Sequence, residues 1–201
     1  MKKIMFNDRY GLTEAVLSGR KTKTRRLADP KKKYTELRLW QPCLMLEYGV
    51  YGYTENDGWV YIKPQYHLGE VVAVAQSYKD AGVNPDYIVS YNDDGTPVSA
   101  IQSPGWKNKM FTRADLMPHH IRITGIRIER LQEITDESCL REGIRYISEI
   151  NKYYFERTDR NEGFYFNTPR EAFAALIDKV SGRGTWESNP YVVVYQFELV
   201  K

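Results

Sequence analysis

Short runs in which apolar residues dominate or alternate with polar ones are the main pattern in this sequence. Residues 3–6 form an apolar run, and residues 71–78 form a run of β-branched and small residues that follows a glycine turn. Residues 121–131 alternate isoleucine with arginine and threonine, and residues 191–200 close the chain with valine and aromatic residues. Because β-branched and aromatic residues at period two favour pleated backbone, each of these four runs is predicted to be a strand.

Two segments have the pattern of β-hairpins. Between residues 48 and 63, two runs rich in Tyr, Val and Trp flank a turn signal at Asp57-Gly58, and residues 87–100 are divided in the same way by Asp94-Gly95. An Asp-Gly pair between alternating strands is a strong hairpin signal. The segment that follows, 103–120, is long and irregular, and long ordered loops are more often functional than idle.

Three short helices are predicted from their end signals. Thr13 precedes a helix that Gly19 ends, Thr135 precedes one that Gly143 ends, and Thr168 precedes one that Gly182 ends. Threonine is a favoured N-cap and glycine a favoured residue just past a helix C-terminus. In the third helix, Pro169 at the first position and Glu171 at the third complete a capping box.

These elements predict a mainly β (α+β) fold of six or more strands with about three short helices. Most strands are joined by hairpins and long loops, which favours a small barrel with helices at its ends over a doubly wound sheet. A chain of 201 residues usually makes one domain, so we expect a single domain over residues 1–201 with insertions around 34–66 and 79–118.

The distribution of cysteine, histidine and apolar residues argues against a membrane protein, a disulfide-rich protein and a metalloprotein. No apolar window long enough for a membrane span or a signal peptide occurs, so a cytoplasmic protein is expected. Cys43 and Cys139 are far apart and predict neither a disulfide framework nor a zinc site. His119 and His120 are adjacent and have no third ligand near them in sequence, so no metal and no cofactor is predicted.

The charge is concentrated near the N-terminus. The formal net charge of the chain is +3. Residues 20–33 contain eight basic residues and one acidic residue, Asp29, so the rest of the chain is slightly acidic. A local positive patch on a slightly acidic chain suits an anionic ligand or a nucleic-acid backbone, although a solvated basic run is the plainer interpretation.

The order of several blocks resembles that of a known family. GRKTKTRR near the N-terminus, LGEVVAVAQSY, IRIERLQEITDESCLREGI and the aromatic closing strand resemble the ASCH domain of the PUA-like superfamily. The blocks SPGWKNKM, LMPHHIRITGIRIERLQEIT and GTWESNPYVVVYQFEL resemble the larger members that phages and mobile elements encode. The resemblance implies a PUA-like pseudo-barrel that binds RNA or a modified nucleobase or nucleoside.

One enzyme group of that family hydrolyses the acyl amide of N4-acetylcytidine with a lysine, a threonine and a glutamate. The resemblance places these roles on Lys21 and Thr24 in GRKTKTRR and on Glu142 in the later helix, with Glu137 as the other possible counterpart of the glutamate. The insertions make this chain about twice as long as those enzymes, which leaves the substrate open.

The residue types also fit this chemistry without the family. A threonine hydroxyl needs an adjacent base to become a nucleophile, and like charges around Lys21 would lower its pKa toward that role. Residues three apart in a regular strand point to opposite faces, so Lys21 must lie in the turn after Gly19 or a bulge must intervene. The alternative for Thr24 is an ordinary half-buried strand residue.

The first functional hypothesis is a reader domain that binds RNA or a modified nucleoside in a basic cleft without turnover, and the hydrolase is its alternative. In it the basic residues neutralise phosphates while an aromatic side chain stacks on a base. Trp106 with Lys107 has the composition of such a contact, and an anchor for the long loop is the equally plausible alternative. The residues expected to contact the ligand are Arg20, Lys23, Arg25, Arg26, Trp106 and Lys107. The expected partner is RNA or a modified nucleoside.

Overall fold

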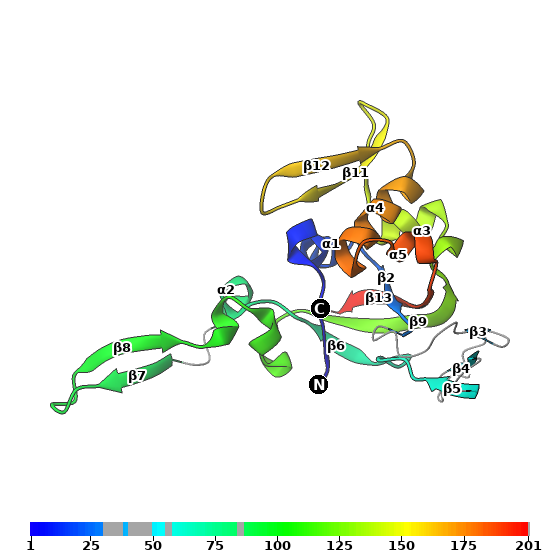
Figure 1. The fold of residues 1–201 in the computed structure, drawn as a ribbon. Coiled ribbons are helices and arrows are strands. Elements are labelled where there is room, and N and C mark those ends of the chain that lie inside the picture. Colours follow the sequence, from blue (N-terminus) through cyan, green and yellow to red (C-terminus); the bar gives the residue numbers. More distant parts are fainter. Residues whose placement is uncertain (30–37, 40–49, 55–57, 84–86, 201) are drawn as a thin grey trace. The chain divides into compact units, whose positions relative to one another are not determined.

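The computed structural model of the chain describes residues 1–29, 38–39, 50–54, 58–83 and 87–200 (Figure 1). It divides into two compact units. The first unit comprises residues 1–6, 71–121 and 200–201, and the second comprises residues 7–70 and 122–199.

The first unit is built on a parallel pair of short strands. Strand β1 (Lys3–Ile4) pairs with β6 (Val71–Val74). Helix α2 (Tyr78–Ala81) follows β6, and its Tyr78 packs with Ala73 and Met117 in a buried cluster. The antiparallel hairpin of β7 (Tyr87–Tyr91) and β8 (Pro97–Gln102) has its turn at Asn92–Thr96, with Gly95 at a φ of 80°. The unit ends with three 3-10 turns, η2 (Pro104–Trp106), η3 (Lys109–Phe111) and η4 (Ala114–Leu116).

The loop 109–112 of the first unit is fixed by a lysine. The Lys3 ammonium donates to the backbone oxygens of Met110 and Thr112 at 2.8 and 2.6 Å. The long segment 103–120 is therefore ordered by its 3-10 turns together with these contacts between Lys3 and backbone carbonyls.

The second unit contains β2 (Lys23–Leu27) and all but the outermost residues of β9 (His120–Arg130) and β13 (Tyr191–Val200), which neighbour one another in the order β9, β13, β2. Strands β13 and β2 are antiparallel, and Lys23, Thr24 and Arg25 lie opposite Gln196, Tyr195 and Val194. The pairing runs through five consecutive residues without a bulge, so Lys23 and Arg25 share one face of β2 while Thr24 points to the other.

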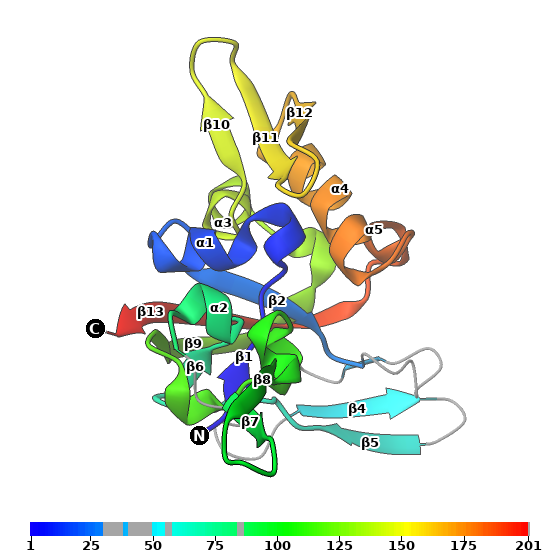
Figure 2. The ribbon, with the colours of Figure 1, turned by 90° about the vertical axis from the view of Figure 1, so that its left-hand side faces the viewer.

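Helices cover one face of these three strands, as Figures 1 and 2 both show. They are α1 (Leu12–Leu17), α3 (Asp136–Arg141), α4 (Pro169–Ser181) and α5 (Thr185–Ser188), with the 3-10 turns η1 (Asp8–Tyr10) and η5 (Leu131–Glu133). On the other face, the rings of Tyr66 and Tyr195 meet edge to face at 5.2 Å. This ring pair covers part of the face opposite the helices.

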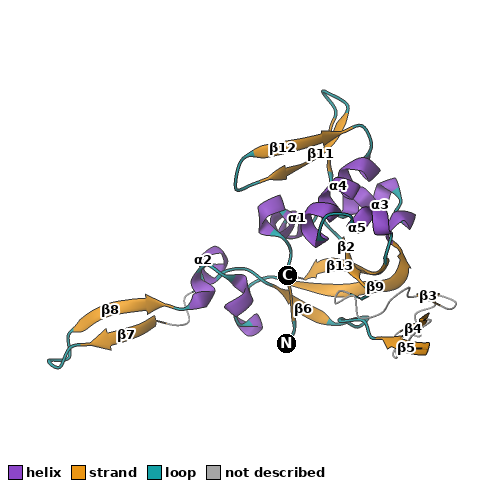
Figure 3. Ribbon diagram, viewed as in Figure 1, coloured by secondary structure: helices purple, strands orange, loops and turns teal. Residues whose placement is uncertain are grey.

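Two smaller antiparallel sheets complete the second unit, as the strand colouring in Figure 3 shows. One contains β3 (Arg38–Leu39), β4 (Val50–Thr54) and β5 (Gly58–Ile62), and the other contains β10 (Arg145–Ile147), β11 (Lys152–Arg157) and β12 (Glu162–Phe166). Phe155 of β11 is buried and stacks on Phe164, while Tyr165 of the neighbouring strand is exposed.

The structure confirms a mixed α and β architecture that is rich in strands, with hairpins as predicted at β4–β5 and β7–β8. The Asp57 half of the first turn signal, and Cys43, lie outside the described residues. Closure of the strands into a pseudo-barrel and the single-domain organisation stay predictions. None of the helices in the described ranges combines the length and the apolar character that crossing a membrane would need.

The N-caps of the three predicted helices agree with the sequence prediction in two cases. The Thr135 and Thr168 side chains accept the predicted N-cap hydrogen bonds, but Thr13 is not a cap. Helix α1 begins at Leu12 because Gly11, at a φ of 62°, takes the N-cap position, and the Thr13 hydroxyl donates to Asp8 instead. The short helices α2 and α5 were not predicted, since four residues give no readable helical period.

Replacing the cap of the longest helix tests this description. Thr168→Ala removes the side-chain acceptor for Glu171 N–H and disrupts the capping box of α4, so we expect a loss of about 1 kcal/mol in the free energy of unfolding, measured by urea denaturation. Ser181→Ala, at the exposed last residue of α4, serves as the control and should stay close to wild type. An equal effect of both changes would contradict the capping role.

Candidate active site

Helix α3 presents Glu142 to the strands because both of its ends are fixed. The Thr135 hydroxyl accepts a hydrogen bond from Ser138 N–H at its start, and Glu142 is the C-cap. Gly143 follows at a φ of 109°, and a Cβ there would meet Leu12 Cδ2 at 3.1 Å. A glycine at this position therefore lets α1 and the end of α3 approach each other closely.

Lys21 lies where the sequence required it, in the irregular segment between Gly19 and β2. Gly19 has a φ of 76°, and the backbone N–H of Lys21 donates to Ala15 O at 2.8 Å. The next residue, Thr22, donates its backbone N–H to Arg141 O at 3.0 Å. These bonds fix the turn between α1 and the end of α3.

The Lys21 and Glu142 side chains form a buried ion pair. The Lys21 ammonium donates to Glu142 Oε2 at 2.6 Å and to Glu142 backbone O at 2.8 Å. Each residue is 3% exposed, although 121 positions separate them in the sequence. The two residues that the resemblance assigned independently to different blocks are thus in direct contact.

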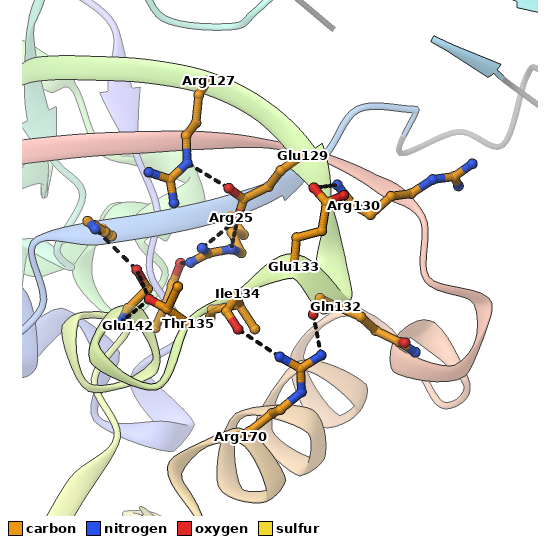
Figure 4. A network of polar contacts seen from close by, with 12 residues as sticks. Arg25, Arg127, Glu129, Arg130, Gln132, Glu133, Ile134, Thr135, Glu142 and Arg170 are labelled. Carbon is orange, nitrogen blue, oxygen red and sulfur yellow. Dashed lines mark hydrogen bonds and ion pairs between the residues drawn. The ribbon is translucent and has the colours of Figure 1, made fainter.

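Arg25 extends this pair into a network that links three elements (Figure 4). Its Nη1 donates to Glu142 Oε1 at 2.9 Å, and its Nη2 donates to Glu129 Oε1 of β9 at 2.6 Å. Arg127 donates to the second oxygen of Glu129, also at 2.6 Å. The Arg25 guanidinium also lies over the ring of Phe173 on α4, 5.9 Å from its centroid. A fully buried arginine is therefore matched by two carboxylates and an aromatic face.

The electrostatics of Lys21 are governed mainly by burial. Removal from water lowers the pKa of the Lys21 ammonium, and the charges of Arg26 and Arg25 lower it further, while the Glu142 carboxylate opposes the shift. The direction agrees with the sequence prediction, but burial is the main cause and the neighbouring like charges contribute less. A lysine biased toward its neutral form can accept a proton, as a general base must.

Thr24 is buried in β2, 5% exposed, but the structure does not bring its hydroxyl onto the Lys21–Glu142 pair. Strand alternation turns Thr24 away from Lys23 and Arg25, toward the face that carries Tyr195. Its side chain makes no hydrogen bond within the ranges that the structure describes. Of the three predicted catalytic residues, Lys21 and Glu142 are therefore in contact. Thr24 lies in β2 between Lys23 and Arg25 and faces the other side of the strand. Glu137, the alternative glutamate, is exposed and pairs with Arg141.

The basic cluster is not the exposed patch that the sequence suggested. Lys23 and Arg25 are only 8% and 6% exposed, and both face α3. Arg20 is paired with Glu14 on α1, and Arg26 is half-buried. The basic residues 31–33 lie outside the described residues.

Trp106 and Lys107 belong to the first unit. Trp106 is partly buried against the cluster of Ala73, Tyr78 and Met117, in agreement with a loop anchor, while Lys107 is exposed. The structure thus gives the indole a packing role, and base stacking by Trp106 stays a prediction. Across the described residues, no three potential His, Cys, Asp or Glu ligands are grouped as a metal site would need.

The sequence analysis missed Glu129, Arg127 and Ser138. Arg127 and Glu129 are two residues apart in a strand that was predicted correctly, so the sequence indicates that they share one face. It does not indicate that Glu129 pairs with Arg25 of β2. Comparison with known proteins adds no assignment, because no family model, curated protein or solved structure matches this chain.

Removing one carboxylate tests the network. Glu142→Gln keeps the shape of the side chain but leaves Lys21 and Arg25 without one of their counter-charges, so we expect a loss of about 3–5 kcal/mol in the free energy of unfolding by urea denaturation. Glu137→Gln is the matched control, because its exposed i,i+4 pair with Arg141 is worth well under 1 kcal/mol. Equal stability of both variants would show that the buried pair does not support the fold.

Proposed function

We propose that the protein is an ASCH domain of the PUA-like superfamily that binds a modified nucleoside at the Lys21–Glu142 pair and removes an acyl group from N4-acylcytidine-type nucleosides. The observation that carries the proposal is the 2.6 Å contact between Lys21 Nζ and Glu142 Oε2. These two residues lie in separate blocks of the sequence, and the family resemblance alone pairs them with the family's lysine and glutamate. Buried ionisable groups with shifted pKa values are also typical of functional sites.

The chemistry assigns one role to each residue. The neutral Lys21 amine accepts the Thr24 hydroxyl proton as the threonine oxygen attacks the acyl carbonyl carbon. The bond between the carbonyl carbon and N4 then breaks, and N4 leaves as an amine after receiving that proton through Lys21 or Glu142. Water hydrolyses the Thr24 ester, which releases the carboxylic acid and restores the hydroxyl. No external oxidant or cofactor enters this sequence.

This mechanism makes a demand on the site. The Lys21 ammonium is held by Glu142 in the structure, and Thr24 points to the other face of β2, so substrate binding must both loosen the Lys21–Glu142 contact and rearrange this part of β2 to bring Thr24 to Lys21. Catalytic hydrogen bonds often tighten only in the substrate complex. Because a contact between Thr24 and Lys21 is needed only for catalysis, the role of Thr24 is the most direct test of the proposal.

Binding of RNA or a modified base without turnover is the second candidate. The observation that favours it is the orientation of Thr24, which faces away from the Lys21–Glu142 pair, because binding alone requires no contact between Thr24 and Lys21. Both candidates use the same site, and they differ in whether Thr24 matters for rate or only for packing.

Replacing Thr24 by valine separates the two candidates. Thr24→Val keeps the β-branched shape, so the fold should survive with a modest loss, while acyl release from N4-acetylcytidine should fall by about a thousandfold or more. The measurement is release of acetate by the wild-type chain and the variant, together with the affinity of each for the nucleoside. Thr22→Val, two residues earlier and outside the strand, is the control and should retain the wild-type rate.

Two results would overturn parts of this proposal. Full activity of Thr24→Val would remove Thr24 from the mechanism. Absence of acyl release from the wild-type chain across a panel of N4-acylcytidines, with nucleoside binding intact, would leave the binding candidate alone.

A further inference from the structure

A second polar cluster lies beside the Lys21–Glu142 pair, around Lys23. The Lys23 ammonium donates to Ser138 Oγ of α3 at 3.2 Å, and Lys23 is 8% exposed. The Ser138 hydroxyl is the one acceptor within hydrogen-bond distance of Lys23 Nζ among the described residues. A buried ammonium that faces only a neutral hydroxyl is costly, because desolvation of a charge is offset only by a counter-charge or several hydrogen bonds.

The carboxylates near Lys23 are engaged by other cations. Glu142 accepts from Lys21 and Arg25, Glu129 accepts from Arg25 and Arg127, and Glu137 pairs with Arg141. Four cationic side chains, Lys21, Arg25, Arg127 and Arg141, share these three carboxylates, and Lys23 contacts only a neutral hydroxyl in the described part of the chain. The cluster therefore has more cations than carboxylates, which favours an anion such as a phosphate monoester.

Two of these cations have the exposure that a ligand contact requires. The side chains of Arg127 and Arg141 are 50% and 45% exposed, so each guanidinium can turn toward an anion while its stem stays in place. Both are close enough to Lys23 for their charges to lower the pKa of its ammonium, after the larger effect of burial. An anion bound among them would relieve this repulsion.

The sheet is open beside this cluster. Gln196 of β13 lies directly opposite Lys23 of β2, and its side chain is exposed. The neighbouring position on β9 is Gly125, where a Cβ would come within 3.4 Å of Gln196 Cβ. The Gln196 side chain lies over Gly125, and its exposed amide carries N–H donors that can bind an anion.

We propose that Lys23, Ser138, Arg127 and Arg141 bind a phosphate group of the ligand. Resting on the proposed function, this inference makes the substrate a phosphorylated form of the modified nucleoside, either a free nucleotide or a residue of RNA. Ser138 and Glu142 are four residues apart on one face of α3 and contact Lys23 and Lys21 in turn, so the phosphate site and the acyl site lie side by side.

Binding of inorganic phosphate tests the site without any nucleoside. We expect the midpoint of thermal unfolding of the wild-type chain to rise with phosphate beyond the effect of sodium chloride at equal ionic strength, because a ligand that binds only the folded state stabilises it. Lys23→Met should abolish this phosphate-dependent rise, and Arg141→Gln should weaken phosphate binding by about tenfold. Lys63→Met, an exposed lysine of the same unit, should leave the rise intact.

Substrate comparison then identifies the source of the phosphate. The kcat/KM for acyl release is measured on N4-acetylcytidine, on its 5′-monophosphate and on a short RNA that contains it. Preference for the monophosphate or for the RNA, lost in Lys23→Met, identifies the nucleotide or the RNA as substrate. Equal kcat/KM for all three in wild type would overturn the inference while leaving the hydrolase proposal standing.

The two proposals fail separately. A phosphate-dependent rise that Lys23→Met abolishes supports the anion site even if no acyl group is released from any substrate. An identical rise in wild type and Lys23→Met, or no rise beyond that in chloride, would overturn the phosphate site whatever the outcome of the hydrolysis assay.

Discussion

Neutralisation of the buried charges of β2 is the constraint on which the rest of the second unit depends. Arg25 has no exposed side-chain surface, and Lys21 lies next to it in the same network. Their carboxylate partners must come from α3 and β9, so the network fixes the end of α3 and one face of β9 against β2. The caps at Thr135 and Gly143 hold α3 in the position where Glu142 can serve both cations.

The same network contains the lysine that the proposed chemistry uses. Buried ion pairs add little net stability compared with well-packed apolar residues, because desolvation offsets most of the attraction. Here they provide a lysine whose pKa is lowered by burial, while the Glu142 carboxylate partly opposes this decrease. The proposed acyl site uses that lysine, and the proposed phosphate site uses the next residue on the same side of the segment, Lys23, which no carboxylate in the described part of the chain contacts directly.

The sequence predicted those features that depend on neighbours along the chain. The Thr168 capping box, the Thr135 cap and the hairpin turn at Gly95 are each encoded within a few residues, and each is present. The position of Lys21 in the turn after Gly19 also followed from local reasoning, because strand alternation excluded the simpler arrangement.

The features that sequence reasoning missed depend on contacts distant in the chain. An alternating basic segment is usually solvated, and nothing within it indicates that carboxylates more than a hundred positions away bury Lys21 and Arg25. The orientation of Thr24 also depends on a distant contact, because the register between β2 and β13 decides which face of the strand Thr24 occupies. Trp106 could not be assigned from its sequence neighbours, because its packing partners come from β6, α2 and Met117.

The central claim is that a modified nucleoside binds at the Lys21–Glu142 pair. A crystal structure of the Thr24→Val variant with N4-acetylcytidine tests it most directly, since this variant should bind the nucleoside without consuming it. The account predicts that the acetyl carbonyl oxygen lies within hydrogen-bond distance of Lys21 Nζ. A nucleoside bound elsewhere, with the Lys21–Glu142 contact unchanged, would contradict the account.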